Sequence, residues 1–342
     1  MTKGFWEKDK SLFTLAPMAD VTDAAFRQII AKYSRPYGPD AIWTEFVSCD
    51  GLCSDGKDAL MHNLWFTEVE RPIVAQFFGS KPDNFYRCAL LAQELGFDGI
   101  DINMGCPDKK VEKQNAGAAL MRNHELAQKI IIETKRGAGN LPVSVKTRIG
   151  YDSDILDEWL PRLLETEPDA ITIHARTRKE MSLVPARWEA IARAVEIARR
   201  YDSSPNRALI IGNGDIVSMI DAEEKVRQSG ADGAMIGRGI FGNPWFFNRE
   251  KDINTISIEE KLLVLIEHAF LFEKLFAGNP RTERAEQSSY DGIKSFSVMK
   301  KHFKAYVSGF DGAKDLRIKL MAARDANDVA QIVEKYRAFF VK

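Results

Sequence analysis

The sequence predicts an α/β fold, a (β/α)8 TIM barrel followed by a C-terminal all-helical domain. Short apolar runs rich in β-branched residues alternate with longer amphipathic runs over residues 12–236. There are eight short runs, which is the strand number of such a barrel. After GNPWFF at 242–247 the strand pattern stops and helical patterns follow. We therefore expect a barrel domain at 1–249 and a helical domain at 250–342.

The barrel prediction depends on the order of strands and helices along the chain. The predicted strands are Leu12–Ala16, Ala41–Thr44, Pro72–Phe77, Gly99–Asn103, Val143–Lys146, Ala170–His174, Ala208–Gly212 and Gly233–Ile236. The predicted helices between them are Ala24–Tyr33, Asn84–Leu95, His124–Lys135, Ile155–Glu165, Trp188–Tyr201 and Ser218–Ser229. This alternation predicts a mostly parallel sheet. The alternative, a doubly wound open sheet, lacks its usual GxGxxG turn after the first strand.

Helical patterns also fill the predicted C-terminal domain. They cover residues 258–276 and 295–342, with the polar stretch AGNPRTERAEQSSYDG at 277–292 between them. Residues 291–342 hold eleven Lys and Arg against six Asp and Glu, a balance of 11 − 6 = +5, whereas the whole chain has a net charge of −1. The excess of basic residues therefore lies in the last part of this domain.

Composition limits the class of protein. The chain has 342 residues, 45% of them hydrophobic, which is enough for a sizeable core. Four cysteines in a chain of this length do not predict a disulfide framework. The N-terminus lacks the apolar region of a signal peptide, and no run approaches the roughly 18 apolar residues of a membrane span. We expect a soluble cytoplasmic protein.

Polar residues follow nearly every predicted strand. In a βα barrel the active site lies at the carboxyl ends of the strands, so these residues should converge. In strand order they are Glu45, Gln76, Asn103 with Cys106, Lys146 with Arg148, His174 with Arg176, Asn213 with Asp215, and Arg238, whereas the first strand is followed by Pro17 and Met18. Packing alone does not explain polar residues at the same end of nearly every strand.

The last two strand ends predict a phosphate site. IIGNGDI and MIGRGIFGNP place glycine-rich turns after strands seven and eight, the usual phosphate position of this barrel. Glycine lets backbone N–H groups approach a phosphate closely, and Arg238 can form a bidentate pair with it. The alternative is two tight turns beside a surface arginine.

Three other strand-end residues indicate what carries the phosphate. Alternation places Lys146 on the opposite face of its strand from Val143 and Val145, so its amine should face the barrel interior. His174 lies on the next strand, and Gln76 offers an amide for a heterocycle edge. Flavin mononucleotide (FMN) meets these demands, although other phosphorylated ligands also fit these residues.

Taken together, the motifs resemble the tRNA-dihydrouridine synthase family. The matching stretches are LAPMADVTDAAFR (15–27), AQFFG (75–79), DINMGCPDKKVEKQNAGAALMRN (101–123), VSVKTRIGY (143–151), ITIHARTR (171–178), IIGNGDI (210–216), GADGAMIGRGIFGNPWFF (230–247) and MKKHFKAYVSGFDGAKDLR (299–317). NMGCP followed by AGAALM is the most specific of them.

This resemblance implies an FMN-dependent reduction of uridine in tRNA to 5,6-dihydrouridine, with NADPH or NADH as the reductant. It implies that Cys106 is the catalytic acid and that Asn103 holds the uracil. The flavin contacts that it implies are Pro17, Met18, Ala19, Gln76, Lys146, His174, Asn213, Gly214, Asp215, Gly237 and Arg238.

The implied chemistry explains a cysteine between a glycine and a proline. Hydride added at C6 of uracil leaves negative charge on C5 and O4, so a proton must reach C5 from the opposite side of the ring. Cys106 would have to be a protonated thiol, and an unperturbed thiol with a pKa of ~8.5 is mostly protonated near neutral pH. Lys109 and Lys110 would lower that pKa, so we expect their side chains to point away from the sulfur. The alternative role is a small buried hydrophobe.

An enzyme that reduces a base in RNA needs a surface for phosphates, because the base must leave its stack. Lys300 and Lys304 are one helical turn apart, and Lys301 extends the same region. At the barrel mouth the candidate RNA contacts are Arg176 and Arg178. Without the resemblance, each charge run would be taken as a solvated face.

Other interpretations remain open from the sequence. A small-molecule flavin reductase would need no basic helical domain, a barrel lyase or isomerase would use the phosphate site for a sugar phosphate, and an RNA chaperone would not need Cys106. Ribosomal RNA is an alternative substrate. Cys49 and Cys53 have the spacing of half a metal site, but no second pair completes it, and we expect no metal. No protein partner is implied, and we expect a monomer.

Overall fold

The computed structural model describes residues 4–6, 10–205, 207–277 and 293–340, which form two compact units. The barrel unit comprises residues 1–19 and 38–239, and the helical unit comprises residues 20–37 and 240–342. The helical unit thus begins at Ile240 rather than at 250, and it includes a segment between the first two strands that the sequence analysis placed in the barrel. Most of the polar stretch predicted at 277–292 lies outside the described residues.

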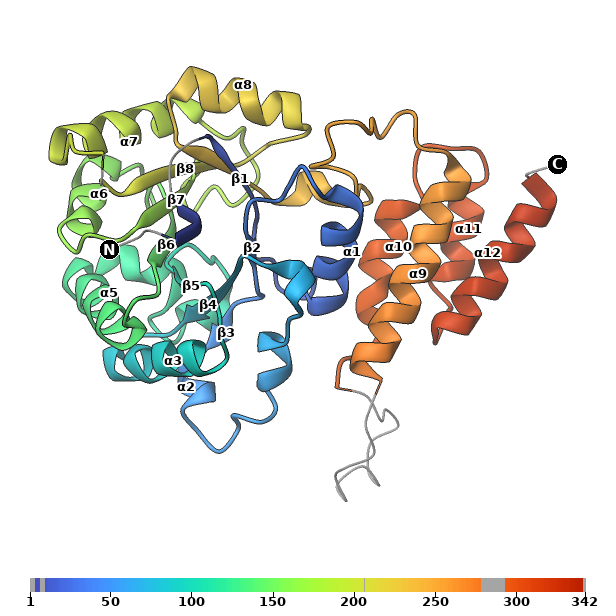
Figure 1. The fold of residues 1–342 in the computed structure, drawn as a ribbon, viewed down its shortest axis with the longest axis horizontal. Coiled ribbons are helices and arrows are strands. Elements are labelled where there is room, and N and C mark those ends of the chain that lie inside the picture. The colour runs from blue at the N-terminus through green and yellow to red at the C-terminus, as the bar shows by residue number, and fades with distance from the viewer. Residues whose placement is uncertain (1–3, 7–9, 206, 278–292, 341–342) are drawn as a thin grey trace. The chain divides into compact units, whose positions relative to one another are not determined.

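Eight parallel strands close the barrel and confirm the predicted fold (Figure 1). Around the barrel the order is β1, β9, β8, β7, β6, β5, β4 and β2, and β2 pairs with β1 to complete the ring. Their bounds are β1 Leu12–Leu15, β2 Ile42–Trp43, β4 Ile73–Phe78, β5 Gly99–Asn103, β6 Val143–Arg148, β7 Ala170–His174, β8 Leu209–Asn213 and β9 Gly233–Ile236.

A ninth short strand, β3 (Val47–Ser48), continues β2 after a bulge. Trp43 pairs with Val74, and Val47 pairs with Phe77. Four steps along one strand (43 to 47) therefore match three steps along its neighbour (74 to 77), which is the extra residue that defines a bulge. The bulge re-aims the residues between the two short strands, among them Phe46.

Helices surround the strands of the barrel unit (Figure 1). Their bounds are α2 Cys49–Leu52, α3 Pro82–Glu94, α4 Lys109–Glu112, α5 His124–Ala138, α6 Leu156–Leu164, α7 Trp188–Tyr201 and α8 Met219–Ser229. Local signals fix several ends: Ser218 accepts a hydrogen bond from the Asp221 N–H as the cap of α8, and Gly230 ends that helix with a φ of 68°. Trp6, Trp43 and Met235 belong to an apolar cluster that fills part of the barrel interior.

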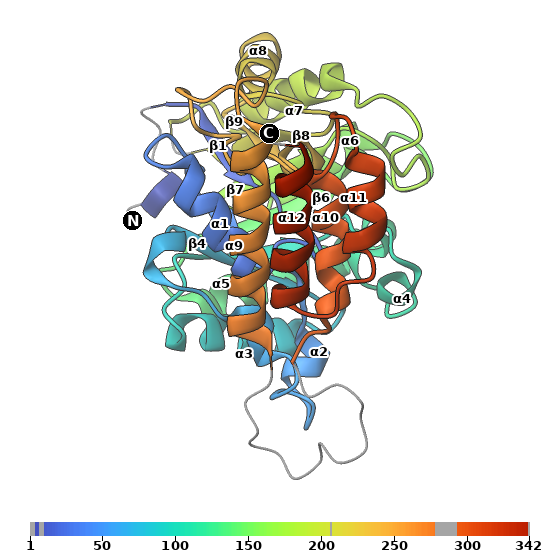
Figure 2. The ribbon, with the colours of Figure 1, turned by 90° about the vertical axis from the view of Figure 1, so that its right-hand side faces the viewer.

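The helical unit contains α1 (Ala24–Ser34), α9 (Ile258–Phe276), α10 (Met299–Tyr306), α11 (Ala313–Leu320) and α12 (Ala326–Phe340). Figure 2 shows α9 to α12 side by side. Their buried faces share one apolar core, to which α1 contributes Ala25 and Ile29, and α9 contributes Phe272 and Phe276. Among the described residues, no helix combines the length and apolar character needed to cross a membrane.

Candidate active site

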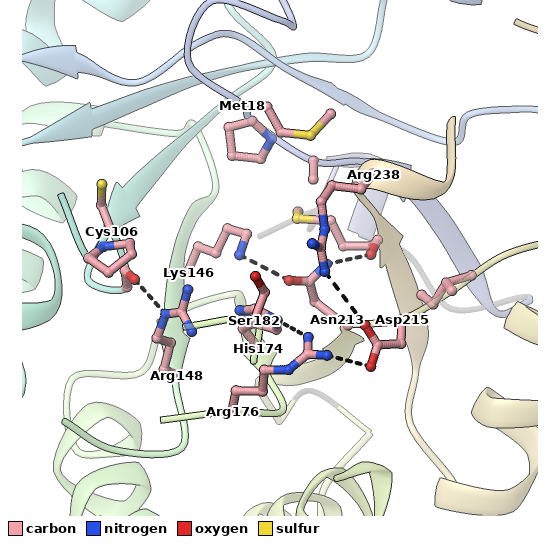
Figure 3. Close-up of a pocket in the computed structure, with 18 of the residues that line it drawn as sticks. Met18, Cys106, Lys146, Arg148, His174, Arg176, Ser182, Asn213, Asp215 and Arg238 are labelled. Carbon is pink, nitrogen blue, oxygen red and sulfur yellow. Dashed lines mark hydrogen bonds and ion pairs between the residues drawn. The ribbon is translucent and has the colours of Figure 1, made fainter. Parts of the chain in front are cut away.

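A pocket of about 680 Å³ opens at the carboxyl ends of the barrel strands (Figure 3). Its volume lies within the range of small-molecule and cofactor sites. Every one of the eight strands or the turn that follows it contributes a lining residue. The predicted residues in the lining are Pro17, Met18, Gln76, Asn103, Cys106, Lys146, His174, Arg176, Asn213, Gly214, Asp215, Gly237 and Arg238. The structure therefore brings together side chains that are far apart in the sequence.

Five predicted site residues are placed elsewhere. Ala19 and Arg178 are not among the lining residues. Lys300, Lys301 and Lys304 lie on α10 of the helical unit, where Lys301 Nζ is 3.2 Å from an Asp20 carboxylate oxygen. The side chains of Lys301 and Lys304 are exposed, as a phosphate-binding surface requires.

Cys106 follows β5 in a turn whose backbone is held by Asn103. The Oδ1 atom of Asn103 accepts hydrogen bonds from the N–H groups of Gly105 (3.2 Å) and Cys106 (2.9 Å). The Cys106 carbonyl accepts from the Ala118 N–H at 3.0 Å. Gly117 has a φ of 61°, and a Cβ there would lie 2.9 Å from the Cys106 oxygen. The AGAALM stretch therefore needs its glycine because it packs directly on the cysteine turn.

The Cys106 side chain is half-buried, and burial is the main cause that raises the pKa of its thiol. A hydrogen bond from the Asp108 backbone opposes the shift, as does the charge of Arg148. Lys109 and Lys110 are exposed. Cys106 is therefore a protonated thiol at neutral pH.

A chain of amide contacts links the Cys106 turn to a buried carboxylate that the sequence analysis missed. Asn103 Nδ2 donates to Gln76 Oε1 at 3.0 Å, and Gln76 Nε2 donates to Asp101 Oδ2 at 2.5 Å. The other carboxylate oxygen of Asp101 accepts from the Ser144 hydroxyl at 2.5 Å. Burial raises the pKa of Asp101 to about 6 against these hydrogen bonds. Asp101 fixes which way the Gln76 amide faces, and through it the orientation of Asn103.

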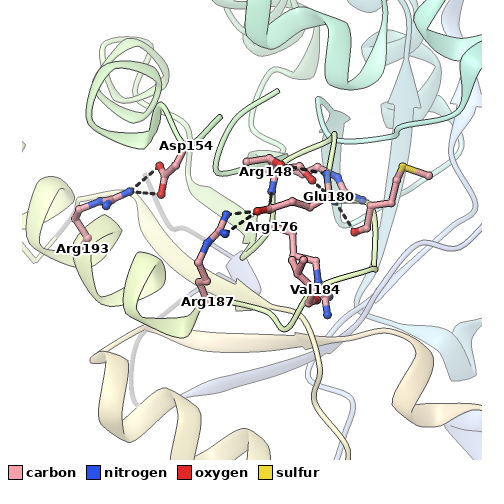
Figure 4. A network of polar contacts seen from close by, with 9 residues as sticks. Arg148, Asp154, Arg176, Glu180, Val184, Arg187 and Arg193 are labelled. Atoms are coloured by element: carbon pink, nitrogen blue, oxygen red, sulfur yellow. Dashed lines mark hydrogen bonds and ion pairs between the residues drawn. The ribbon is translucent and has the colours of Figure 1, made fainter. Parts of the chain in front are cut away.

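Arg148 was noted at a strand end, but its role was not predictable from its position. Its Nε donates to the Gly105 carbonyl at 2.8 Å. Its Nη1 donates to the carbonyls of Thr177 (3.1 Å) and Met181 (3.2 Å), on the side of Arg148 that Figure 4 shows. Burial lowers the pKa of this guanidinium to about 10, so it stays charged at neutral pH. Arg148 thus ties the Cys106 turn to the loop after β7.

Lys146 and His174 face the same pocket from neighbouring strands. Burial, followed by the charge of Arg148, lowers the pKa of Lys146 to about 8, and its amine donates to Asn213 Oδ1 at 3.3 Å. Burial, then nearby cations, holds the pKa of His174 well below its usual value. His174 Nε2 lies 3.2 Å from Arg176 Nη1, which is always a donor, so Nε2 is the acceptor and the proton of the neutral ring is on Nδ1.

Asp215 and Arg176 form an ion pair within the predicted phosphate site. Arg176 Nη2 is 2.5 Å from Asp215 Oδ2, and Arg176 Nε donates to the Val184 carbonyl. Burial would raise the pKa of Asp215, but the hydrogen bonds from Arg176 and the Ala186 N–H hold it below its usual value. Arg176 is 2% exposed, so it shapes the pocket from within rather than extending from the mouth.

Arg178 instead pairs with Glu112 on α4, with its Nε 2.6 Å from Oε1. Tyr151 lies beneath two arginines, with the Arg122 guanidinium 3.6 Å and that of Arg178 5.3 Å from its ring centre. These contacts hold α4, which follows the Cys106 turn. Within the described part of the chain, no group of three or more His, Cys, Asp or Glu side chains lies close enough to hold a metal ion.

The fold is similar to that of two solved structures. Histamine dehydrogenase from Rhizobium sp. 4-9 superimposes with a TM-score of 0.50 at 13% identity, covering 79% of this chain and 50% of that one. The 6-hydroxypseudooxynicotine amine oxidase from Pseudomonas geniculata N1 gives 0.50 at 12%, covering 72% and 47%. At these identities the likeness shows the fold alone.

The family follows from the sequence itself. The dihydrouridine synthase (Dus) family model matches residues 14–341. A "probable tRNA-dihydrouridine synthase 2" of Bacillus subtilis (strain 168) is 39% identical over 339 residues, 98% of this chain and 97% of the relative. A "probable tRNA-dihydrouridine synthase" of Staphylococcus aureus (strain MRSA252) is 38% identical over 341 residues, 99% of this chain and 97% of the relative. The chain belongs to the dihydrouridine synthase family, which confirms the resemblance.

Proposed function

We propose that this protein reduces uridine in tRNA to 5,6-dihydrouridine, using bound FMN and NADPH or NADH as the reductant. Family membership supports the reaction. The observation that carries the mechanism is the place of Cys106: a half-buried thiol on the rim of a pocket that also contains Lys146, His174 and Arg238. A barrel lyase or an RNA chaperone does not require a protonated thiol there.

The donor set of the pocket fits a flavin with a phosphate tail. Lys146, Arg148, Arg176 and Arg238 place four cationic side chains around the pocket, against the one carboxylate of Asp215. A Cβ added at Gly237 would have no heavy atom closer than 3.9 Å, so this glycine leaves space beside Met18. We infer that the turns at 213–215 and 237–238 hold the phosphate, and that Lys146, Gln76 and His174 face the ring system. When bound, the flavin would supply the hydride for C6 of uracil.

The neighbouring turn residues contribute in different ways. The Asp215 side chain is occupied by Arg176 and the Ala186 N–H. We infer that residues 214 and 215 contact the phosphate through backbone N–H groups, because both have positive φ angles that turn the chain sharply. Pro17, Met18 and Ala19 come from the end of β1, and we propose that they complete the flavin contacts.

The protein itself supplies the proton for C5 of uracil, from Cys106. Burial keeps Cys106 protonated, and Asn103 holds its turn with two backbone hydrogen bonds. One hydrogen of the Asn103 amide is used by Gln76, and the second is available for a uracil carbonyl. Asn103 would therefore position both the Cys106 thiol and the uracil ring that receives its proton.

The RNA-binding surface is proposed on the helical unit and at the barrel mouth. Lys300, Lys301 and Lys304 would contact phosphates, and the excess of basic residues after 291 would attract the tRNA. Arg176 and Arg178 form hydrogen bonds within the protein and so stabilise the site. Only their remaining N–H groups would contact RNA. We propose that the protein acts as a monomer in the cytoplasm, where tRNA is modified.

The test uses Cys106→Ala, with Cys53→Ala as the matched control because Cys53 lies outside the pocket. Cys106→Ala should bind flavin and accept electrons from NADPH at the normal rate. Its single-turnover reoxidation by unmodified tRNA should fall about 10²–10⁴-fold, the usual contribution of a positioned acid. Normal reoxidation in Cys106→Ala would refute the acid role, and a colourless purified protein would refute the flavin.

A further inference from the structure

Outside the pocket, the three remaining cysteines form one cluster. Cys49 begins α2, Cys53 follows its end, and Cys88 lies in α3. Cys53 Sγ is 3.8 Å from the carbonyl oxygen of Asn84, and Cys88 Sγ is 3.9 Å from the carbonyl oxygen of Cys49. Asn84 is one helical turn before Cys88, and Cys49 is one turn before Cys53. Each thiol therefore points at the turn that carries the other.

Contacts between α2 and α3 keep this arrangement in place. Asn84 Nδ2 donates to Asp50 Oδ1 at 2.6 Å, and Lys81 Nζ lies 3.4 Å from the other oxygen of Asp50. The Ser48 hydroxyl accepts from the Gly51 N–H and so caps α2. The two turns that carry the thiols are held in register before any bond forms between them.

The cysteines differ in access and in protonation. Cys53 is half-exposed, whereas Cys49 and Cys88 are buried. The pKa of Cys88 is lowered, mainly by a hydrogen bond from Cys49. Burial opposes this shift, and a hydrogen bond from Cys53 adds to it. Burial raises the pKa of Cys53 to about 11, so the thiol that solvent can reach is protonated and lies beside a buried thiol whose pKa is lowered. A solvent-accessible thiol with a second cysteine within reach is the arrangement from which a disulfide can form.

We propose that Cys53 and Cys88 are a site of reversible oxidation, at which a hydroperoxide converts the two thiols to a disulfide. The Cys53 sulfur attacks one peroxide oxygen, the O–O bond breaks, and the Cys53 thiol proton passes to the leaving oxygen, so that a sulfenic acid on Cys53 and water or an alcohol result. The Cys88 sulfur then attacks the Cys53 sulfur, the S–S bond forms, and the sulfenic oxygen leaves as water with the Cys88 proton. Two sulfurs are oxidised and one peroxide is reduced, and a dithiol reverses the reaction by exchange.

The experiment treats the full-length protein with hydrogen peroxide, then denatures it in an alkylating reagent. Labelled thiols should fall from the four of the reduced chain to two. Trypsin leaves Cys88 and Cys106 in one peptide, which ends at Lys109, and Cys49 and Cys53 in another, which ends at Lys57. A second cleavage on the N-terminal side of Asp50 and Asp98 is therefore needed to assign the bond. The linked peptides should carry Cys53 and Cys88, and dithiothreitol should restore all four thiols.

Three variants separate this proposal from general cysteine oxidation. Cys106→Ala should still form the bond, with labelled thiols falling from three to one. Cys49→Ala should also keep it, because both partners remain. Cys53→Ser, a substitution at a half-exposed position, should retain all three of its thiols at the same peroxide dose. A bond that involves Cys49 or Cys106, a bond that persists in Cys53→Ser, or no bond at a dose that oxidises Cys106 would overturn the proposal.

Discussion

Each unit of this protein buries a cluster of polar side chains, and the two clusters are built in opposite ways. In the barrel, Asp101, Gln76 and Asn103 are connected by hydrogen bonds that end at the backbone of Cys106. In the helical unit, His268 and His302 lie with ring centres 4.6 Å apart. Among the described residues, neither ring nitrogen of His268 has a hydrogen-bond partner.

The difference shows what each cluster can do. A hydrogen-bonded network fixes the orientation of its members, so the barrel cluster can position a reacting group. The histidines pack against Phe26 and Tyr306 as aromatic rings and fix no proton. Burial lowers the pKa of His302 to about 3 and that of His268 well below its usual value. The helical cluster therefore behaves as part of an apolar core that acid can charge.

The largest expected effect comes from breaking the barrel cluster. Asp101→Ala leaves the Gln76 amide and the Ser144 hydroxyl without their acceptor in a buried place. Each unpaired group costs about 1–3 kcal/mol, so the free energy of unfolding should fall by about 4 kcal/mol. Urea denaturation followed by circular dichroism measures it, with exposed Asp83→Ala as the control. A loss below that of Ser144→Ala would show that the network does not act as a unit.

The next largest expected effect is a loss of stability of the helical unit at acid pH. Both histidines are neutral when folded and have a pKa near 6.5 when unfolded, so below pH 6.5 the unfolded state binds more protons. Their stabilising contribution is complete above pH 6.5 and is lost as the pH falls towards about 3. At pH 5 each histidine should lower the free energy of unfolding by about 2 kcal/mol.

Hydrogen exchange of α9 and α10 peptides at pH 7 and pH 5, corrected for intrinsic rates, reports this local loss. His268→Leu/His302→Leu is the control, because it removes both titrating groups and should abolish the difference in protection. Equal acid sensitivity in this variant and in the natural chain would assign the effect to other groups.

A smaller effect is expected where the barrel network meets the cysteine turn. Arg148→Lys keeps the charge but cannot donate to the carbonyls of Gly105, Thr177 and Met181 together. The Cys106 turn should loosen, and single-turnover reduction of tRNA should slow about tenfold, since misplacement of a reacting group is costly. The rate of Cys106 alkylation should rise in the same variant. An unchanged alkylation rate with slow turnover would mean that Arg148 acts on the substrate instead.

The smallest expected effect is that of removing a buried histidine, and it gives the most direct contrast between the two clusters. His268→Leu removes two ring nitrogens that have no partner and keeps an apolar side chain. At pH 8 the free energy of unfolding should change by no more than about 1 kcal/mol, in contrast to Asp101→Ala, because no bonded group is left unpaired. Thermal unfolding at pH 8 tests this, and a large loss would show that His268 has a hydrogen bond in solution.

Much of the fold was predictable because it depends on local patterns. Short apolar runs predicted the strands at 99–103, 170–174 and 233–236 with the bounds that the structure has. The helix predicted at 218–229 ends at Ser229 as expected, and Gly230 caps it. The rule that parallel strands present their carboxyl ends together then gave most of the pocket lining, with no knowledge of packing.

The sequence by itself determined that these polar residues meet at one end of a barrel, since strand order and period are local properties. Only the tertiary structure decided which side chain bonds to which. Asp101 turned out to orient Gln76, Arg176 to pair with Asp215, and Arg178 with Glu112. The bulge that presents Phe46, and the grouping of α1 with the helical unit, were likewise set by packing. The physical reason is that a buried hydrogen bond depends on atoms brought within about 3 Å of each other from distant segments, and no local pattern encodes that distance.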